Sequence, residues 1–170
     1  VLLTADGGVL LIRLKGETKY QDALEELGKR PEGQKTDLER ATSWDANARW
    51  VELLQILLHV AGLGTVTRLR RPRLTVLLSC YDELDADDGP PRERLAEGLP
   101  LVSAFIDSTW VGEAVSVWGL SALGRPLDRH NNDQEFVDKG SETQGWVIHP
   151  EGGARDPDLT RPLAWLLEAR

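Results

Sequence analysis

Cysteine, methionine and long apolar runs are all scarce in this sequence. Its 170 residues include a single cysteine, Cys80, and no methionine. One cysteine excludes a disulfide framework and any zinc site built from several cysteines, and it fits a reducing compartment. No apolar stretch reaches the roughly 20 residues that a membrane-spanning helix needs, and no signal peptide is recognisable. The sequence therefore predicts a cytoplasmic protein without membrane contact.

Positively charged residues are outnumbered by negatively charged ones. The chain carries 20 lysines and arginines against 28 aspartates and glutamates, a formal net charge of -8. This balance repels phosphate backbones and anionic lipid surfaces, which disfavours a nucleic-acid or membrane partner. A small anion such as a nucleotide is still compatible, because helix N-termini and backbone amides can bind it locally. Apolar content of 41% is typical of a globular chain with one core.

The chain opens at Val1, almost inside an apolar element. Together with the missing methionine, this leads us to expect a fragment, or one half of something larger. A processed natural N-terminus is the alternative.

Three short apolar runs alternate with segments of helical periodicity. The runs predict buried strands at 9–14, 74–79 and 114–119, with a strand-like piece at 146–148. Helices are expected at 20–29, from about 45 to 61, at 92–110 with a break at Gly98–Pro100, and at 157–169. Strands alternating with helices indicate an α/β fold with a parallel sheet and right-handed crossovers.

Polar residues next to two of these helices are candidate N-caps. Ser43 or Asp45 can cap the second helix, and Asp156 or Asp158 the last one. The second helix is apolar almost all round and is expected to be buried against a sheet or a partner. Gly62 and Gly64 follow it and are expected to end it.

The strands at 74–79 and 114–119 each run into a small polar cluster. Asp82 follows the first and Ser121 follows the second. Parallel strands present their carboxyl ends on one rim, where doubly wound sheets bind ligands, so both clusters are expected there. A carboxylate at this rim can accept hydrogen bonds from the ring N–H and the exocyclic amine of guanine. The alternative is that Asp82 only stabilises a turn.

The turn formed by Ser121, Ala122 and Leu123 complements Asp82. A tight turn at this place can aim a backbone N–H at the guanine carbonyl, and its small residues let a base approach closely. The alternative is a plain strand-to-loop turn with flexibility from Gly119 and Gly124.

Five segments resemble, in order, the C-terminal part of a P-loop GTPase domain, most closely that of the bacterial double-GTPase proteins of predicted conflict systems. The segment 5–12 resembles the entry into their fourth strand, and 77–84 the base-specificity motif (Asn or Thr, Lys, any residue, Asp). The segment 118–124 resembles the Ser-Ala-Lys or Ser-Ala-Leu motif, and 145–150 and 158–167 resemble the closing segment. The resemblance implies a partial P-loop GTPase-type three-layer α/β fold that lacks the N-terminal phosphate-loop half, with 1–170 as one domain.

The sequence departs from the family pattern in two respects. Cys80 stands where the family has lysine, which puts stacking on the base in doubt, and Ser79 replaces Asn or Thr. No Gly-x-x-x-x-Gly-Lys-Ser/Thr motif occurs in the 170 residues, and the switch threonine and magnesium-binding aspartate have no counterpart. Phosphate binding and hydrolysis are therefore not expected from this chain alone.

The resemblance implies a GTP-binding switch in a bacterial defence system, with GTP and Mg²⁺ bound in the complete protein. Asp82 would read the base edge, Ser121, Ala122 and Leu123 would frame the base carbonyl, and Ser79 would support the strand end. The expected partners are guanine nucleotide and either a protein or a missing N-terminal half. The alternative is a catalytically inactive GTPase-like module that presents an interaction surface.

The remaining chemistry-bearing residues favour structural interpretations. Cys80 could be a nucleophile with His130 or His149 as its base, but a buried structural thiol is the simpler interpretation. The acidic run from Asp82 to Asp88 lacks the glutamate of a calcium loop, because Ala96 stands at that position counted from Asp85. It is expected to be a solvated turn.

Overall fold

The computed structural model describes residues 5–15, 45–64, 66–84, 89–125 and 144–168. The helix expected at 20–29 and His130 lie outside the described residues. So do most of the acidic run that follows Asp82 and the segment 126–143.

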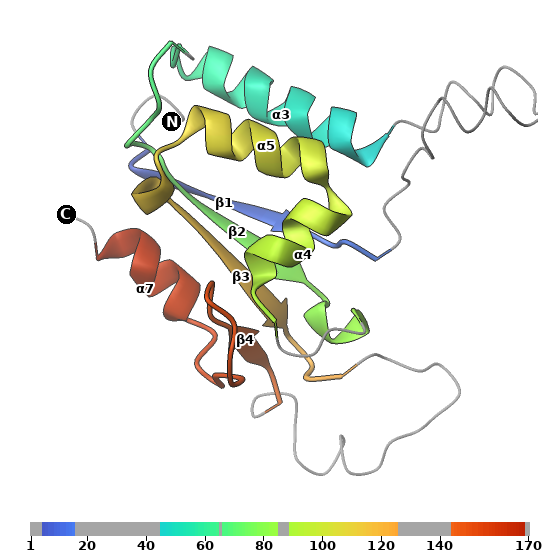
Figure 1. Cartoon of the computed structure of the whole chain (residues 1–170). Coiled ribbons are helices and arrows are strands. Elements are labelled where there is room, and N and C mark those ends of the chain that lie inside the picture. The colour runs from blue at the N-terminus through green and yellow to red at the C-terminus, as the bar shows by residue number, and fades with distance from the viewer. Residues whose placement is uncertain (1–4, 16–44, 65, 85–88, 126–143, 169–170) are drawn as a thin grey trace, which may run out of the picture.

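A four-stranded sheet forms the centre of the structure, in the order β1-β2-β3-β4 (Figure 1). The strands are β1 (Gly7–Ile12), β2 (Arg73–Ser79), β3 (Val115–Ser121) and β4 (Trp146–Ile148). The first three run parallel and β4 runs antiparallel to β3. The predicted α/β class and the three parallel neighbouring strands are therefore confirmed, with β1 starting two residues earlier than expected.

The register of the sheet aligns apolar residues into one buried face. Leu10 lies beside Val76, and Val76 lies beside Val117. All three are nearly inaccessible to solvent, as are Ile12 and Leu78 in the next row. Alternate residues of a strand share a face, so this face carries an almost continuous aliphatic surface toward the helices.

Three helices cover this buried face (Figure 1). They are α3 (Ala46–Val60), α4 (Pro91–Gly98) and α5 (Pro100–Thr109). The predicted break is confirmed, because Pro91 and Pro100 each open a helix and Leu99 between them is fully buried. A proline at the first helical position has no N–H to leave unpaired, so it can start a helix where it would break a continuous one.

The ends of α3 follow the expected signals. The Asp45 side chain accepts a hydrogen bond from the backbone N–H of Asn47 at 3.0 Å, so Asp45 is the N-cap. Gly62 adopts a φ of +67°, and its N–H donates to the carbonyl of His59 at 2.9 Å. A left-handed residue after the helix is the usual way to satisfy its last carbonyls, and glycine adopts it without strain.

We predict that Asp45→Ala lowers the free energy of unfolding by about 1 kcal/mol, because it removes the acceptor for an N–H that has no partner inside the helix. Asp45→Asn is the matched control, since it keeps an acceptor oxygen. Urea denaturation followed by circular dichroism measures both. An equal loss for the two variants would show that the charge of Asp45, rather than its cap, stabilises α3.

The fourth described helix, α7 (Arg161–Leu167), covers part of the opposite sheet face. Arg73 of that face stacks its guanidinium 3.5 Å from the ring centre of Trp165, and a Cβ on Gly7 would lie 2.7 Å from Leu166. The expected cap is wrong: Thr160 is the N-cap residue and makes no side-chain cap bond. Asp158 instead accepts from the N–H and hydroxyl of Thr160, which builds the turn before the helix.

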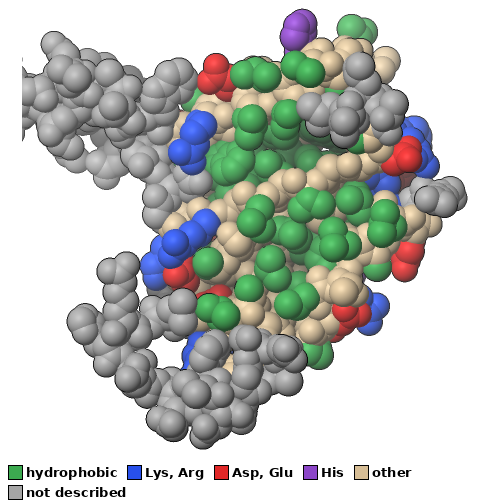
Figure 2. All heavy atoms as spheres, turned by 180° about the vertical axis from the view of Figure 1, so that it is seen from behind, with side chains coloured by type: hydrophobic (Ala, Val, Ile, Leu, Met, Phe, Trp, Pro, Cys, Tyr) green, Lys and Arg blue, Asp and Glu red, His purple; other side chains and the backbone are tan. Residues whose placement is uncertain are grey.

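The rest of this second face is left open by the described residues. Val9 and Leu11 of β1 are 46% and 55% exposed, and hydrophobic side chains gather across the face in Figure 2. Among the described residues, β1 pairs only with β2 and so lies at the sheet edge. The outward face of α3 is likewise apolar, with Ile56 and Val60 exposed, so this helix is less buried than its composition predicts. None of the described helices is long and apolar enough to cross a bilayer.

Candidate functional site

Two turns meet at the carboxyl edge of the parallel strands. A 3-10 helix, Tyr81–Glu83, follows β2, and Ser121 ends β3. The register places Ser79 beside Leu120, so the two turns begin at neighbouring positions. The structure therefore brings the turn of Asp82 and the turn after Ser121 to one edge of the sheet, as the sequence predicts.

Cys80 makes the turn out of β2. Its backbone is left-handed, with φ 52° and ψ 44°, and it is the one non-glycine residue with positive φ among those the structure describes. Such a conformation costs a residue with a side chain on the order of 1–3 kcal/mol, and it persists where neighbouring contacts enforce it. Those contacts come from the residues on either side of Asp82.

Tyr81 anchors the turn from inside. Its side chain is 2% exposed, and its hydroxyl donates to the carbonyl of Gly89 at 3.0 Å. The ring meets Trp146 edge to face, with ring centres 6.5 Å apart. A Cβ on Gly119 would lie 2.8 Å from this ring, so β3 needs glycine at the point where Tyr81 crosses it.

Glu83 anchors the turn from the other side. Arg13, just after β1, donates to both carboxylate oxygens of Glu83 over 2.7 to 3.0 Å. Lys15 donates to the backbone carbonyl of Glu83 at 3.2 Å. The hydrogen bonds and charge of Glu83 raise the pKa of Arg13, which stays fully cationic. This contact bridges 70 positions in the sequence and binds the turn to the neighbouring strand.

Asp82 lies between Tyr81 and Glu83 in the sequence and takes part in the anchoring contacts of neither residue. Its carboxylate makes no hydrogen bond or ion pair with another described residue, and its side chain is half-buried. Adjacent carboxylates therefore differ: Glu83 pairs with Arg13, while no described residue bonds to the oxygens of Asp82. The hydroxyl of Ser79, at the end of β2, donates to the carbonyl of Ile12 at the end of β1 at 3.3 Å.

The turn after β3 is held by its own serine. Ser121 is fully buried, and its hydroxyl oxygen accepts from the N–H of Gly124 at 2.9 Å. Gly124 has a φ of +74°, and its carbonyl accepts from the indole of Trp146 at 3.2 Å. Ala122 is exposed and Leu123 half-buried. A ligand at this turn would therefore meet the backbone and these two side chains, while the Ser121 hydroxyl shapes the turn.

The sequence also matches a known protein family. The family model DO-GTPase1, described as Double-GTPase 1, matches residues 1–166. The chain belongs to the double-GTPase 1 family. No curated protein matches it, and no solved structure matches it. Membership supports a GTPase-related, GTP-binding domain, and it agrees with a four-stranded, mostly parallel sheet flanked by helices.

Cys80 has the properties of a structural thiol in this double-GTPase domain. Burial raises the pKa of Cys80, and the nearby carboxylates of Glu83 and Asp82 raise it further, although Arg13 opposes them. A raised pKa keeps the group as a thiol at neutral pH, and the thiol is a poor nucleophile. His149 packs against Trp118, with ring centres 5.0 Å apart, on the far side of β3 from β2. His130, the other base considered for Cys80, lies outside the described residues.

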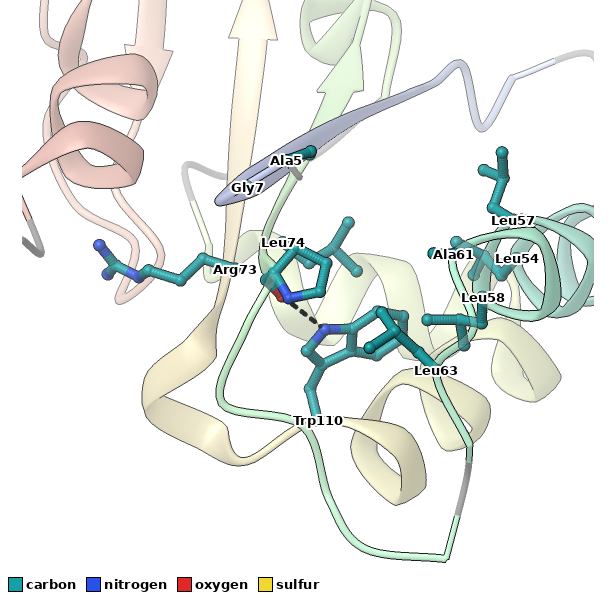
Figure 3. Close-up of a pocket in the computed structure, with 12 residues that line it drawn as sticks. Ala5, Gly7, Leu54, Leu57, Leu58, Ala61, Leu63, Arg73, Leu74 and Trp110 are labelled. Atoms are coloured by element: carbon teal, nitrogen blue, oxygen red, sulfur yellow. Dashed lines mark hydrogen bonds between the residues drawn. The ribbon is translucent and has the colours of Figure 1, made fainter. Parts of the chain in front are cut away.

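One cavity of the double-GTPase domain that described residues line lies at the opposite end of the parallel strands. This apolar cavity of about 110 Å³ opens near the amino ends of the strands, between Gly7, Leu58 and Trp110 (Figure 3). The indole of Trp110 donates to the carbonyl of Pro72 at 2.9 Å there, and the described residues that line the cavity include no carboxylate. It therefore does not suit a guanine base. The described residues contain no group of three metal-ligating side chains.

Two contributors to the edge were missed by reasoning from sequence. Arg13 and Glu83 lie 70 positions apart, and although Glu83 falls within the segment 77–84, no role was expected for either residue. The available signal was their placement, because Arg13 lies near the end of the predicted strand 9–14 and Glu83 comes shortly after the predicted strand 74–79. Parallel strands end on the same edge, so opposite charges after two neighbouring strands can meet there.

Proposed function

We propose that this chain is the guanine-reading part of a GTP-binding switch in a bacterial conflict system, and that it forms the C-terminal portion of the GTPase-like domain. The observation that carries the proposal is the carboxylate of Asp82, which is unbonded among the described residues although both its neighbours are anchored. A strand-end carboxylate whose oxygens no described residue occupies can accept hydrogen bonds from a ligand.

Guanine matches this acceptor. Its ring N–H and exocyclic amine point the same way, and the two oxygens of Asp82 can accept both bonds. Adenine lacks this pair of donors. The N–H of Leu123 donates to no other described residue, so it is the group we assign to the guanine carbonyl. Ser121 and Ala122 frame that N–H, and Ser79 holds the adjoining strand end.

The residues that we assign to GTP account for recognition of its base and not for binding of its phosphates. Family membership implies GTP with Mg²⁺, and when bound these supply the phosphoryl group and the charge neutralisation for its transfer. The residues of the edge that we assign to GTP contact only the base, and the described residues contain no cluster of three or more carboxylate, histidine or cysteine side chains that could hold a metal. We therefore place the phosphate and metal contacts in a partner or in an N-terminal half, which acts together with this chain.

The second candidate is an inactive GTPase-like module that binds a protein. The observation in its favour is the edge strand β1, in which Val9 and Leu11 are exposed and whose outer edge pairs with no other described strand. An apolar strand at an edge can pair with a strand of another protein. This surface is also where a phosphate-binding half would join, so both candidates predict association there.

We predict that the 170-residue chain does not hydrolyse GTP and binds it within about tenfold of its affinity for guanosine, because phosphate contacts supply most of the affinity of complete GTPases and their motif is missing. Isothermal titration with guanosine, adenosine and GTP, together with a phosphate-release assay in Mg²⁺, measures this. Guanosine should bind more tightly than adenosine.

The three ligands separate the candidates. Equal binding of guanosine and adenosine, or no binding of either, would favour the interaction module over the base-reading site. Steady turnover of GTP by this chain would contradict the division of labour that we propose.

A further inference from the structure

The residues on both sides of Asp82 are anchored by their side chains. Tyr81 is fixed in the core, and Glu83 is bonded to Arg13 on the surface. Asp82 itself has no described partner. Whether its carboxylate stays aimed at one place therefore depends on how firmly the 3-10 helix around it is held at both ends.

The backbone of this helix is a weak support. It has three residues and two turn hydrogen bonds, from Glu83 N–H to the Cys80 carbonyl at 3.0 Å and from Leu84 N–H to the Tyr81 carbonyl at 3.1 Å. Short 3-10 helices have poor hydrogen-bond geometry, and this one starts from a strained left-handed residue. Tyr81 fixes its beginning, but the end needs a side-chain anchor.

Arg13 provides that side-chain anchor by donating hydrogen bonds to both carboxylate oxygens of Glu83. Its planar guanidinium contacts both oxygens of Glu83, which fixes the carboxylate in rotation as well as in position. The Glu83 side chain is 16% exposed and that of Arg13 is 57% exposed, so water has limited access to the carboxylate side of this contact. Arg70 and Glu113, for comparison, are 80% and 84% exposed and 3.6 Å apart.

We infer that Arg13 is a positioning residue for base recognition: through Glu83 it holds the turn that aims Asp82, and guanine selectivity depends on it. This inference rests on the proposed function of Asp82. Arg13 acts without touching the base, so its loss should reduce selectivity while the fold stays intact. Arg13→Lys should fail to replace it, because lysine keeps the charge but cannot contact both oxygens in one plane.

The first test needs no ligand. Amide hydrogen exchange by NMR should show the Glu83 and Leu84 amides exchanging about two- to fivefold faster in Arg13→Gln than in the wild type, the range expected for a partly exposed ion pair. Arg70→Gln is the matched control at the opposite end of the strands and should leave both rates unchanged. Equal exchange in Arg13→Gln and the wild type would overturn the inference.

The second test measures selectivity. Guanosine and inosine differ by the exocyclic amine, so the ratio of their affinities reports how well Asp82 is aimed. We expect the ratio to fall toward one in Arg13→Gln and Arg13→Lys, to stay at the wild-type value in Arg70→Gln, and to recover in the charge swap Arg13→Glu with Glu83→Arg. Melting curves verify that every variant is folded.

The outcomes distinguish the two proposals. A wild-type ratio near one would refute base reading by Asp82, and the positioning inference with it. A wild-type preference for guanosine that Arg13→Gln retains would leave base reading in place and overturn the role of Arg13. If Arg13→Gln and Arg13→Lys are folded and unselective, and the charge swap does not restore the ratio of the affinities for guanosine and inosine, the role that we assign to the ion pair is likewise overturned.

Discussion

Replacing Tyr81 with alanine should lower the free energy of unfolding by about 3–5 kcal/mol, the range for removing a large aromatic side chain from a core. Tyr81 is 2% exposed and fills the space left by the missing side chain of Gly119. It also packs edge to face on Trp146. Its removal therefore opens a cavity at the contact between the turn and β3, and β3 cannot move in to fill it without losing its pairing with β2.

Tyr81→Phe is the matched control for this effect. It keeps the ring and removes only the hydroxyl that donates to the carbonyl of Gly89 at 3.0 Å. We expect a loss of about 1 kcal/mol, since one neutral hydrogen bond is removed. Urea denaturation of both variants, followed by tryptophan fluorescence, measures the difference. Nearly equal losses would show that the hydroxyl, rather than ring packing, holds the turn.

The central sheet could be predicted because its strands are defined by local composition. Leu74, Val76 and Leu78 belong to a short apolar run bounded by polar residues, and a run of this length is typical of a buried strand. The start of β1 could not be placed, because Gly7 and Gly8 have no preference for strands. They enter the strand through pairing with Arg73 and Leu74, which is a tertiary effect.

The helix caps show a similar division. Asp45 caps α3 as predicted, because a cap needs only residues that are near in sequence. Asp158 did not become a cap, since its carboxylate bonds to Thr160 and delays the start of α7 to Arg161. In both cases an aspartate carboxylate accepts a hydrogen bond from the backbone N–H two residues later. The sequence alone does not show whether this bond caps a helix or builds the turn before it.

The location of the candidate site could be predicted from the sequence, but some of the contacts that build it could not. Asp82 and Ser121 could be placed on one edge because each follows a strand of the same parallel sheet. The left-handed backbone of Cys80 was hidden, since cysteine has no preference for it. The contact of Arg13 with Glu83 was hidden as well, because it joins segments 70 positions apart.

The control for the base-reading experiment is Asp107→Asn. Asp107 is half-exposed on α5 and pairs with Arg92, away from the edge where Asp82 lies. Both substitutions remove one negative charge from a strongly acidic chain, so a change in general electrostatics would appear in both. Only a change in base recognition should be specific to Asp82.

Asp82→Asn should shift the preference of the chain from guanosine toward xanthosine. The carboxylate of Asp82 accepts from the ring N–H and the exocyclic amine of guanine, whereas xanthine replaces that amine with a carbonyl that would face an acceptor. An asparagine amide presents a donor to this carbonyl, and its own oxygen can still accept from the ring N–H. An unpaired polar group in a buried contact costs about 1–3 kcal/mol, so each protein should disfavour the wrong base by roughly tenfold or more. Competition between guanosine, xanthosine and adenosine on the wild type, Asp82→Asn and Asp107→Asn measures the shift, with melting curves to verify folding. If Asp82→Asn keeps the base preference of the wild type, Asp82 is a turn residue and the guanine-reading site does not exist.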